Sequence, residues 1–178
     1  MAVEIEIEDP SLVVLVGAAG AGKSTFAGRH FAAGEILSSD RFRAIVSGDE
    51  ANQAATKAAF ELLHRTLAAR LARRRLTVVD ATSVRPAARR ALVQRADAAG
   101  IASVAIVLDL PAATVVARNA ARPARTVDLA VVRRQLAGVR SALDGPLPPL
   151  FGEGFRQVVV LTDAAEVDQV TIRRRPAQ

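Results

Sequence analysis

The feature that most constrains the fold is a glycine-rich segment that lies between an apolar run and a helical pattern. Residues 17–24 read Gly-Ala-Ala-Gly-Ala-Gly-Lys-Ser and match the pattern G-x-x-x-x-G-K-[ST] without a mismatch. The apolar run at residues 12–16 and the helical pattern that follows give this motif the context in which it has a mechanism. Glycines let the backbone wrap closely around phosphate groups, and free N–H groups at a helix start bind phosphate oxygens. The segment therefore predicts a strand, a phosphate loop and a helix.

Apolar runs of strand length alternate with longer helical patterns along the rest of the chain, which is typical of βαβ units. Such strands are nearly continuous in Val, Ile and Leu because helices cover both faces of a parallel sheet. We expect an α/β fold of the P-loop NTPase type, with a mostly parallel five-stranded sheet flanked by helices and a helical lid that carries arginines. The expected strands are 12–16, 35–38, 76–80, 102–109 and 157–161, and the expected helices are 23–31, 50–74, 86–99, 111–121 and 127–143.

The length of 178 residues fits one domain. The segment 144–154 is rich in Gly and Pro and predicts a loop within the same domain, since the strand after it is too short to found a second one. We expect residues 1–170 to form one domain of the P-loop type. Residues 171–178 are expected to be a tail or the start of a linker to a further domain.

The charge is +6, and all of the 24 basic residues except Lys23 and Lys57 are arginines. Arginine suits phosphate binding, but a codon bias that favours alanine and arginine also explains this skew. The role of each arginine must therefore be argued from its position. Cysteine is absent, which excludes disulfides, thiolate zinc sites and a cysteine nucleophile. The acidic N-terminus is unlike a secretory signal, and no apolar run is long enough to cross a bilayer. We expect a cytoplasmic protein without a membrane partner.

Within the motif, Lys23 is placed to contact the β- and γ-phosphates of a nucleoside triphosphate, and the Ser24 hydroxyl is placed to hold Mg²⁺. Nucleotide binding alone does not define a reaction. A kinase, an NTPase switch or motor, and a nucleotide-sensing module all remain open at this point.

A kinase also needs a base on the acceptor side, and two strand ends supply carboxylates. Asp40 follows the expected strand 35–38, where it could accept the proton of an attacking hydroxyl, and Arg43 lies one helical turn further on. The alternative for Asp40 is an N-cap of the next helix. Asp80 ends the strand 76–80 and could hold Mg²⁺ through a water molecule, or could only order the following turn.

Arg118 and Arg122 project from one face of an expected helix, and Arg125 follows just beyond Pro123. This is where a small P-loop kinase carries its lid, whose arginines neutralise the phosphoryl group in transfer. The alternative is a solvated helix face. Other arginines, including Arg89, are expected to lie on exposed faces.

These residues resemble the kinase domain of bacterial polynucleotide kinase-phosphatase, the end-healing component of an RNA repair system. The resemblance rests on residues 17–26, on 36–40 with Arg43, on 46–50, on 77–82, and on Arg118-Asn119 with Arg122 and Arg125. These motifs occur in the family's order over essentially the whole chain. The chain departs from the family pattern at Pro123-Ala124. The neighbour on the acceptor side is Phe42, and the chain has no Tyr or Trp, so any stacking on a terminal base must come from Phe or Arg.

The resemblance implies transfer of the γ-phosphoryl group of ATP to a 5′-hydroxyl end of RNA or DNA, with Mg²⁺ as cofactor. It implies that Asp40 is the general base, that Arg43 and Arg125 contact the acceptor, and that Lys23, Arg118 and Arg122 act on the transferred group. The implied nucleotide-binding residues are Gly17, Gly20, Ala21, Gly22, Lys23, Ser24, Thr25, Arg118 and Arg122, with Ser24 and Asp80 near the metal.

The family's kinase domain precedes phosphatase and nucleotidyltransferase domains, which would be partners downstream. Two other functions stay open. One is a small-molecule kinase with a sugar or antibiotic acceptor, which would need an enclosed acceptor pocket. The other is a regulatory module that binds a nucleotide and transfers nothing.

Overall fold

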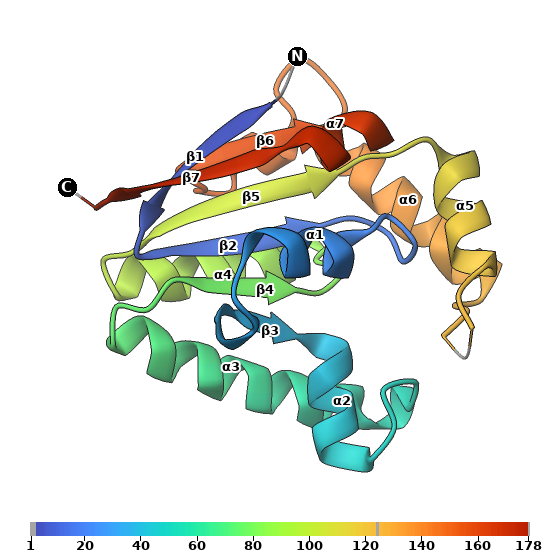
Figure 1. The fold of residues 1–178 in the computed structure, drawn as a ribbon, viewed down its shortest axis with the longest axis horizontal. Coiled ribbons are helices and arrows are strands. Elements are labelled where there is room, and N and C mark those ends of the chain that lie inside the picture. The colour runs from blue at the N-terminus through green and yellow to red at the C-terminus, as the bar shows by residue number, and fades with distance from the viewer. Residues whose placement is uncertain (1–2, 124, 178) are drawn as a thin grey trace.

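A computed structural model describes residues 3–123 and 125–177 of the chain, so Ala124 of the departure noted above lies outside the described residues. Five parallel strands form the central sheet in the order β3-β4-β2-β5-β6 (Figure 1). Their bounds are β2 Ser11–Val16, β3 Ile36–Ser38, β4 Thr77–Asp80, β5 Ala102–Leu108 and β6 Gln157–Leu161. The expected α/β fold is confirmed, and each expected strand agrees with the structure to within one residue at either end.

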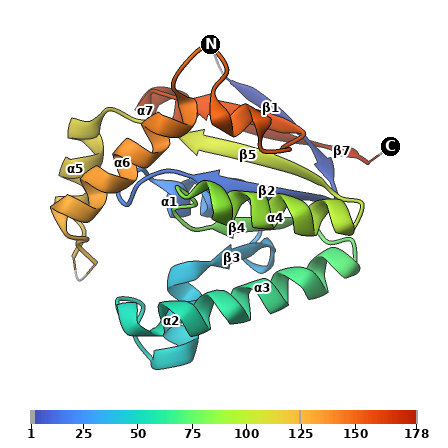
Figure 2. The same cartoon turned by 180° about the vertical axis from the view of Figure 1, so that it is seen from behind.

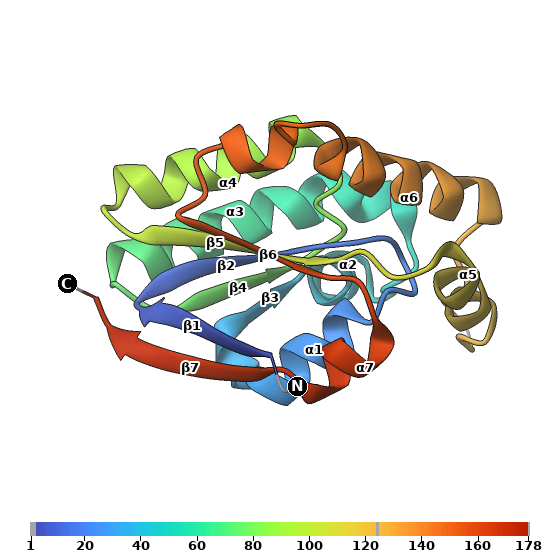
Figure 3. The same ribbon diagram turned by 90° about the horizontal axis from the view of Figure 1, so that it is seen from above.

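Figures 2 and 3 show from behind and from above that helices cover both faces of the sheet. An apolar core lies on each face. Alternate residues of β2 face opposite cores, with Val13 on one side and Val14 on the other. Helices α1 (Lys23–His30) and α7 (Ala164–Gln169) cover the first core. Helices α3 (Thr56–Ala72), α4 (Pro86–Ala98) and the C-terminal half of α6 (Leu129–Leu143) cover the second. Among the described residues, no helix has both the length and the apolar character that a membrane span needs.

The remaining two helices lie at the carboxyl ends of the strands. Helix α2 (Ser39–Ser47) follows β3 directly, and α5 (Ala112–Ala120) follows β5. The helix expected over 50–74 begins only at Thr56, after a short 3₁₀ turn. The side chains of Asp49 and Asn52 accept hydrogen bonds from the backbone at Ala51 (2.9 Å) and Ala54 (3.0 Å), and such bonds compete with helix formation.

Residues 171–176, which we expected to belong to a tail or the start of a linker, form strand β7 (Thr171–Pro176). This strand pairs in parallel with β1 (Glu4–Asp9) in a second, two-stranded sheet. Acidic side chains on β1 face arginines on β7, for example Glu6 and Arg175 at 3.0 Å. Ile5 and Ile7, between the acidic residues, are buried in the first core. Charge pairing and apolar burial together explain why this segment is ordered.

Arg89 is fully buried, so the prediction of an exposed position is wrong. Its guanidinium donates two hydrogen bonds of 2.6 Å to the Glu153 carboxylate and further bonds to the carbonyls of Ser83 (3.0 Å) and Val84 (2.8 Å). Glu153 lies in the glycine- and proline-rich loop after α6. The buried pair therefore attaches that loop to the turn between β4 and α4.

Replacing one member of this pair leaves the other charge buried without a partner. We expect Glu153→Ala to lower the free energy of unfolding by about 3–5 kcal/mol, measured by urea denaturation. The double change Arg89→Met with Glu153→Leu removes both charges and should recover most of the loss. Wild-type stability in Glu153→Ala would contradict this account of the pair.

Candidate active site

A cleft of about 820 Å³ opens at the carboxyl ends of the parallel strands, where ligands bind in open α/β sheets. It is bordered by residues 17–24, called the phosphate loop below, by α2, and by the lid, the segment that carries Arg118, Arg122 and Arg125. Most predicted site residues line this cleft, namely Gly20, Gly22, Lys23, Ser24, Thr25, Asp40, Arg43, Asp80, Arg118, Arg122 and Arg125. Gly17 and Ala21 do not line it and instead hold the loop through backbone bonds to Thr82 and Ala18.

The backbone of the phosphate loop is shaped by Gly20 and Gly22, whose φ angles lie well inside the region that favours glycine. Gly20 has φ of +93°, and Gly22, at +97°, is the N-cap of α1. A Cβ atom on Gly20 would lie 2.5 Å from the Val115 carbonyl oxygen in α5, so no other residue fits there. Lys23 Nζ donates to the Ala18 carbonyl at 2.9 Å across the loop. The resulting loop places backbone N–H groups and one ammonium at the start of a helix, an arrangement that binds anions.

Burial dominates the electrostatics at the bottom of the cleft. Burial lowers the pKa of Lys23 to about 8; the charges of Asp80 and Asp40 oppose this change, and that of Arg122 adds to it. Burial also raises the pKa of Asp80, although a hydrogen bond from Ser24 and the charge of Lys23 favour its ionised form. The Ser24 hydroxyl and the Asp80 carboxylate are hard oxygen donors, the kind that Mg²⁺ takes together with substrate phosphates. These two residues fit the predicted metal position.

Asp40 lies in the first turn of α2, but it is not the cap of that helix. Ser38 is the N-cap, since its side chain accepts a hydrogen bond from the Arg41 backbone at 3.5 Å. The capping alternative for Asp40 is therefore not realised. The Asp40 carboxylate accepts hydrogen bonds from Arg43 and, at 3.3 Å, from Arg125 of the lid.

Glu50 completes this network; the sequence placed it only within the resemblance at residues 46–50 and gave it no role. Its carboxylate accepts a hydrogen bond from Arg125 at 2.5 Å, and its carbonyl accepts one from Arg43 at 2.7 Å. Two arginines and two carboxylates thus form the acceptor wall of the cleft, by which we mean Asp40, Arg43, Glu50 and Arg125.

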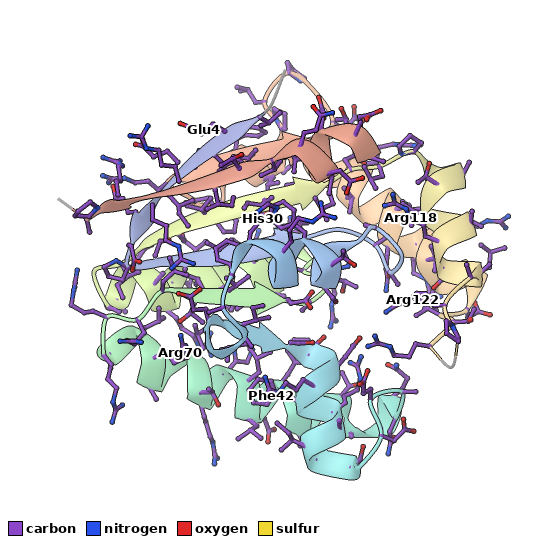
Figure 4. The ribbon with its side chains drawn as sticks, in the orientation of Figure 1. Glu4, His30, Phe42, Arg70, Arg118 and Arg122 are labelled. Carbon is purple, nitrogen blue, oxygen red and sulfur yellow. The ribbon has the colours of Figure 1, made fainter. Side chains whose placement is uncertain are left out.

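The lid arginines line the cleft from the phosphate loop to the acceptor wall, with Arg118 and Arg125 exposed to solvent and Arg122 half-buried. One guanidinium nitrogen of Arg118 lies 3.6 Å from where a Cβ of Gly22 would be. Arg122 is near enough to Lys23 and Asp80 to influence the pKa of both. Arg125 reaches the acceptor wall. Figure 4 shows Arg118 and Arg122 on the α5 side of the molecule, across from α2.

Phe42 does not contribute an aromatic surface to the cleft. It is 7% exposed and packs in the second apolar core, in the region between α2 and α3 (Figure 4). Phe60 of α3 lines the cleft instead. Other lining residues had no predicted role, among them Thr82, Arg85 and Gln135. No motif marks Arg85 or Gln135, because they reach the cleft only through the packing of elements that are distant in the sequence.

A protein-family model described as an AAA domain matches residues 12–146, which includes the phosphate loop, α2 and the lid. A search of curated proteins found no match.

Among solved structures, a putative kinase from Chloroflexus aurantiacus J-10-fl is 20% identical, with a TM-score of 0.59 over 86% of this chain and 88% of that one. A chain of the Pnkp1/Rnl/Hen1 RNA repair complex is 22% identical, with a TM-score of 0.62 over 75% of this chain and 45% of that one. A gluconokinase from Sinorhizobium meliloti 1021 is 18% identical, with a TM-score of 0.53 over 92% and 90%. These similarities show a P-loop kinase fold.

The lowered pKa of Lys23 predicts a pH-dependent affinity for nucleotide. A bound triphosphate favours the charged ammonium, so affinity should be constant below the free-protein pKa of about 8. Above it, affinity should fall, by up to about tenfold per pH unit. Titration with a fluorescent nucleoside triphosphate from about pH 7 to pH 9.5 measures this. Lys23→Arg is the control because arginine stays charged in that range. A wild-type affinity as independent of pH as that of the variant would contradict the prediction.

Proposed function

This chain belongs to the AAA-domain family, and from that premise we propose that it is an ATP-dependent polynucleotide 5′-hydroxyl kinase that acts on RNA or DNA ends. The observation that carries the proposal is the acceptor wall. A carboxylate at a strand end lies between two arginines, on the side of an open cleft opposite the phosphate loop. The carboxylate suits an attacking hydroxyl, and the guanidinium groups suit a phosphate beside that hydroxyl.

On the donor side, the phosphate loop with Lys23 would bind the β- and γ-phosphates of ATP, and Arg118 would lie above the same loop. Ser24 would hold Mg²⁺ directly and Asp80 through a water molecule. When bound, Mg²⁺ supplies positive charge to the β- and γ-phosphates. The backbone N–H groups at the start of α1 point in the same direction, so the triphosphate is fixed by groups that are already in place.

In the proposed reaction, the 5′-oxygen attacks the γ-phosphorus in line with the bond to the β-bridging oxygen. That bond breaks, ADP leaves, and the hydroxyl proton passes to the Asp40 carboxylate. Arg122, between Lys23 and the acceptor wall, would neutralise charge on the group in transfer. Positioning and charge neutralisation then provide most of the catalysis.

The rival function is a small-molecule kinase, which would share the phosphate loop, the strand-end carboxylate and the lid. The acceptor wall disfavours a neutral sugar, which offers no anion to replace the carboxylate of Glu50 at Arg125, and the assay below separates a polynucleotide from the carboxylate acceptors gluconate and shikimate. A polynucleotide carries a phosphate next to its terminal nucleoside, and arginine binds such a group in bidentate fashion.

The direct test is transfer of label from γ-labelled ATP to a panel of acceptors. The panel contains RNA and DNA oligonucleotides with a 5′-hydroxyl, the same oligonucleotides with a 5′-phosphate, a nucleoside, gluconate and shikimate. We expect label on the 5′-hydroxyl oligonucleotides, weak labelling of the nucleoside and none on the others. Label on gluconate or shikimate alone would establish the small-molecule kinase, and ATP loss without a labelled acceptor would establish the regulatory module.

Asp40→Asn tests the base. We expect transfer to fall roughly 10²- to 10⁴-fold, while ATP affinity stays unchanged because the phosphate loop is intact. Asp97→Asn, which changes an exposed carboxylate on α4, is the matched control and should behave as wild type. Undiminished transfer in Asp40→Asn would disprove the assignment.

A further inference from the structure

Asn119 is a buried polar side chain, only 3% exposed, in the last turn of α5, between Arg118 and Arg122 of the lid. Its amide nitrogen donates to the Val127 carbonyl at 2.7 Å, and its amide oxygen accepts from the Val127 backbone N–H at 3.1 Å. One side chain thus satisfies both backbone groups of a residue eight positions later. The two bonds fix the ends of the segment that carries Arg122 and Arg125.

Further bonds brace the described part of this segment from within. The Arg122 backbone N–H donates to the Asn119 carbonyl at 3.3 Å, and the Thr126 hydroxyl donates to the Arg122 carbonyl at 3.0 Å. The carbonyl of Arg122 is therefore bonded to a residue that directly precedes Val127. The position of the Arg122 backbone therefore depends on the position of Val127, which the two hydrogen bonds of Asn119 fix.

The same asparagine lies against the phosphate loop. A Cβ atom on Gly20 would lie 3.0 Å from the Asn119 backbone nitrogen and 3.1 Å from its Cβ. On the far side of the lid, Asp128 caps α6, and Gln135 of α6 accepts a hydrogen bond from the Ala19 backbone at 2.8 Å. Both ends of the lid are therefore connected to the loop that holds Lys23.

We propose that Asn119 is a positioning residue that fixes Arg122 relative to the phosphate loop before any ligand binds. The proposal rests on the phosphoryl-transfer function above. Its chemistry is specific, because an amide offers one donor and one acceptor at the spacing of a peptide group. Aspartate would place a charge against the Val127 carbonyl, and alanine would leave two backbone groups without partners.

Asn119→Ala tests the two bonds without reference to catalysis. We expect the Val127 amide to exchange its hydrogen much faster in the variant than in the wild-type chain, measured by NMR. Equal exchange in the two proteins would overturn the proposal. This measurement needs no acceptor, so it separates failure of the proposal from failure of the kinase assignment.

The kinetic test is a double-mutant cycle between Asn119→Ala and Arg122→Ala. We expect Asn119→Ala to lower kcat about 10²-fold through misplacement of Arg122, with the KM for ATP nearly unchanged. The double variant should be no slower than Arg122→Ala alone, because Asn119 acts through that arginine. The cycle uses whichever acceptor the wild-type chain phosphorylates, or water in ATP hydrolysis.

Leu71→Ala is the matched control for lost stability, since Leu71 is buried in α3 at the end of the sheet away from the cleft. It should reduce the melting temperature and leave kcat unchanged. Effects of Asn119→Ala and Arg122→Ala that multiply in the double variant would overturn the proposal. An equal loss of kcat in Leu71→Ala would do the same.

Discussion

The close approach of Gly20 to the last turn of α5 determines the geometry of the whole cleft. Because a glycine stands at this position, the phosphate loop packs against helix backbone with no side chain between them. The last turn of α5 carries Arg118 and leads into the segment with Arg122 and Arg125. This backbone contact therefore links the phosphate loop, which we propose to bind the nucleotide, to the segment that we propose to reach the acceptor. A larger residue would move the loop and this segment apart.

The positive charges of the acceptor wall are balanced by carboxylates of the protein itself. Arg43 and Arg125 are paired with the protein's own carboxylates, Asp40 and Glu50. An incoming phosphate would replace one anion by another at these guanidinium groups. The overall charge of +6 says little about this wall, where the two signs are balanced.

The sequence could predict the central sheet because its strands are short, continuous apolar runs between loops. It could also predict most of the cleft, because the carboxyl ends of parallel strands converge. It could not predict β1 or the burial of Arg89, since their partners lie 167 and 64 positions away and nothing local marks the pairing. Phe42 and Phe60 show the same limit, because which of them faces the cleft depends on how α2 and α3 pack. Ser38 and not Asp40 is the helix cap, because α2 begins at Ser39 and the cap is the residue directly before the helix.

The parallel pairing of β1 with β7 has a mechanical consequence. In a parallel pair the start of one strand lies at the opposite end of the ribbon from the finish of the other. Tension between the start of β1 and the finish of β7 would therefore act along the strands. It would load all of their hydrogen bonds at once, together with the ion pairs beside them, whereas an antiparallel hairpin pulled at its two ends opens one bond at a time. The two-stranded sheet would therefore be loaded in shear, and it would resist a force that could otherwise be transmitted to the central sheet and the cleft.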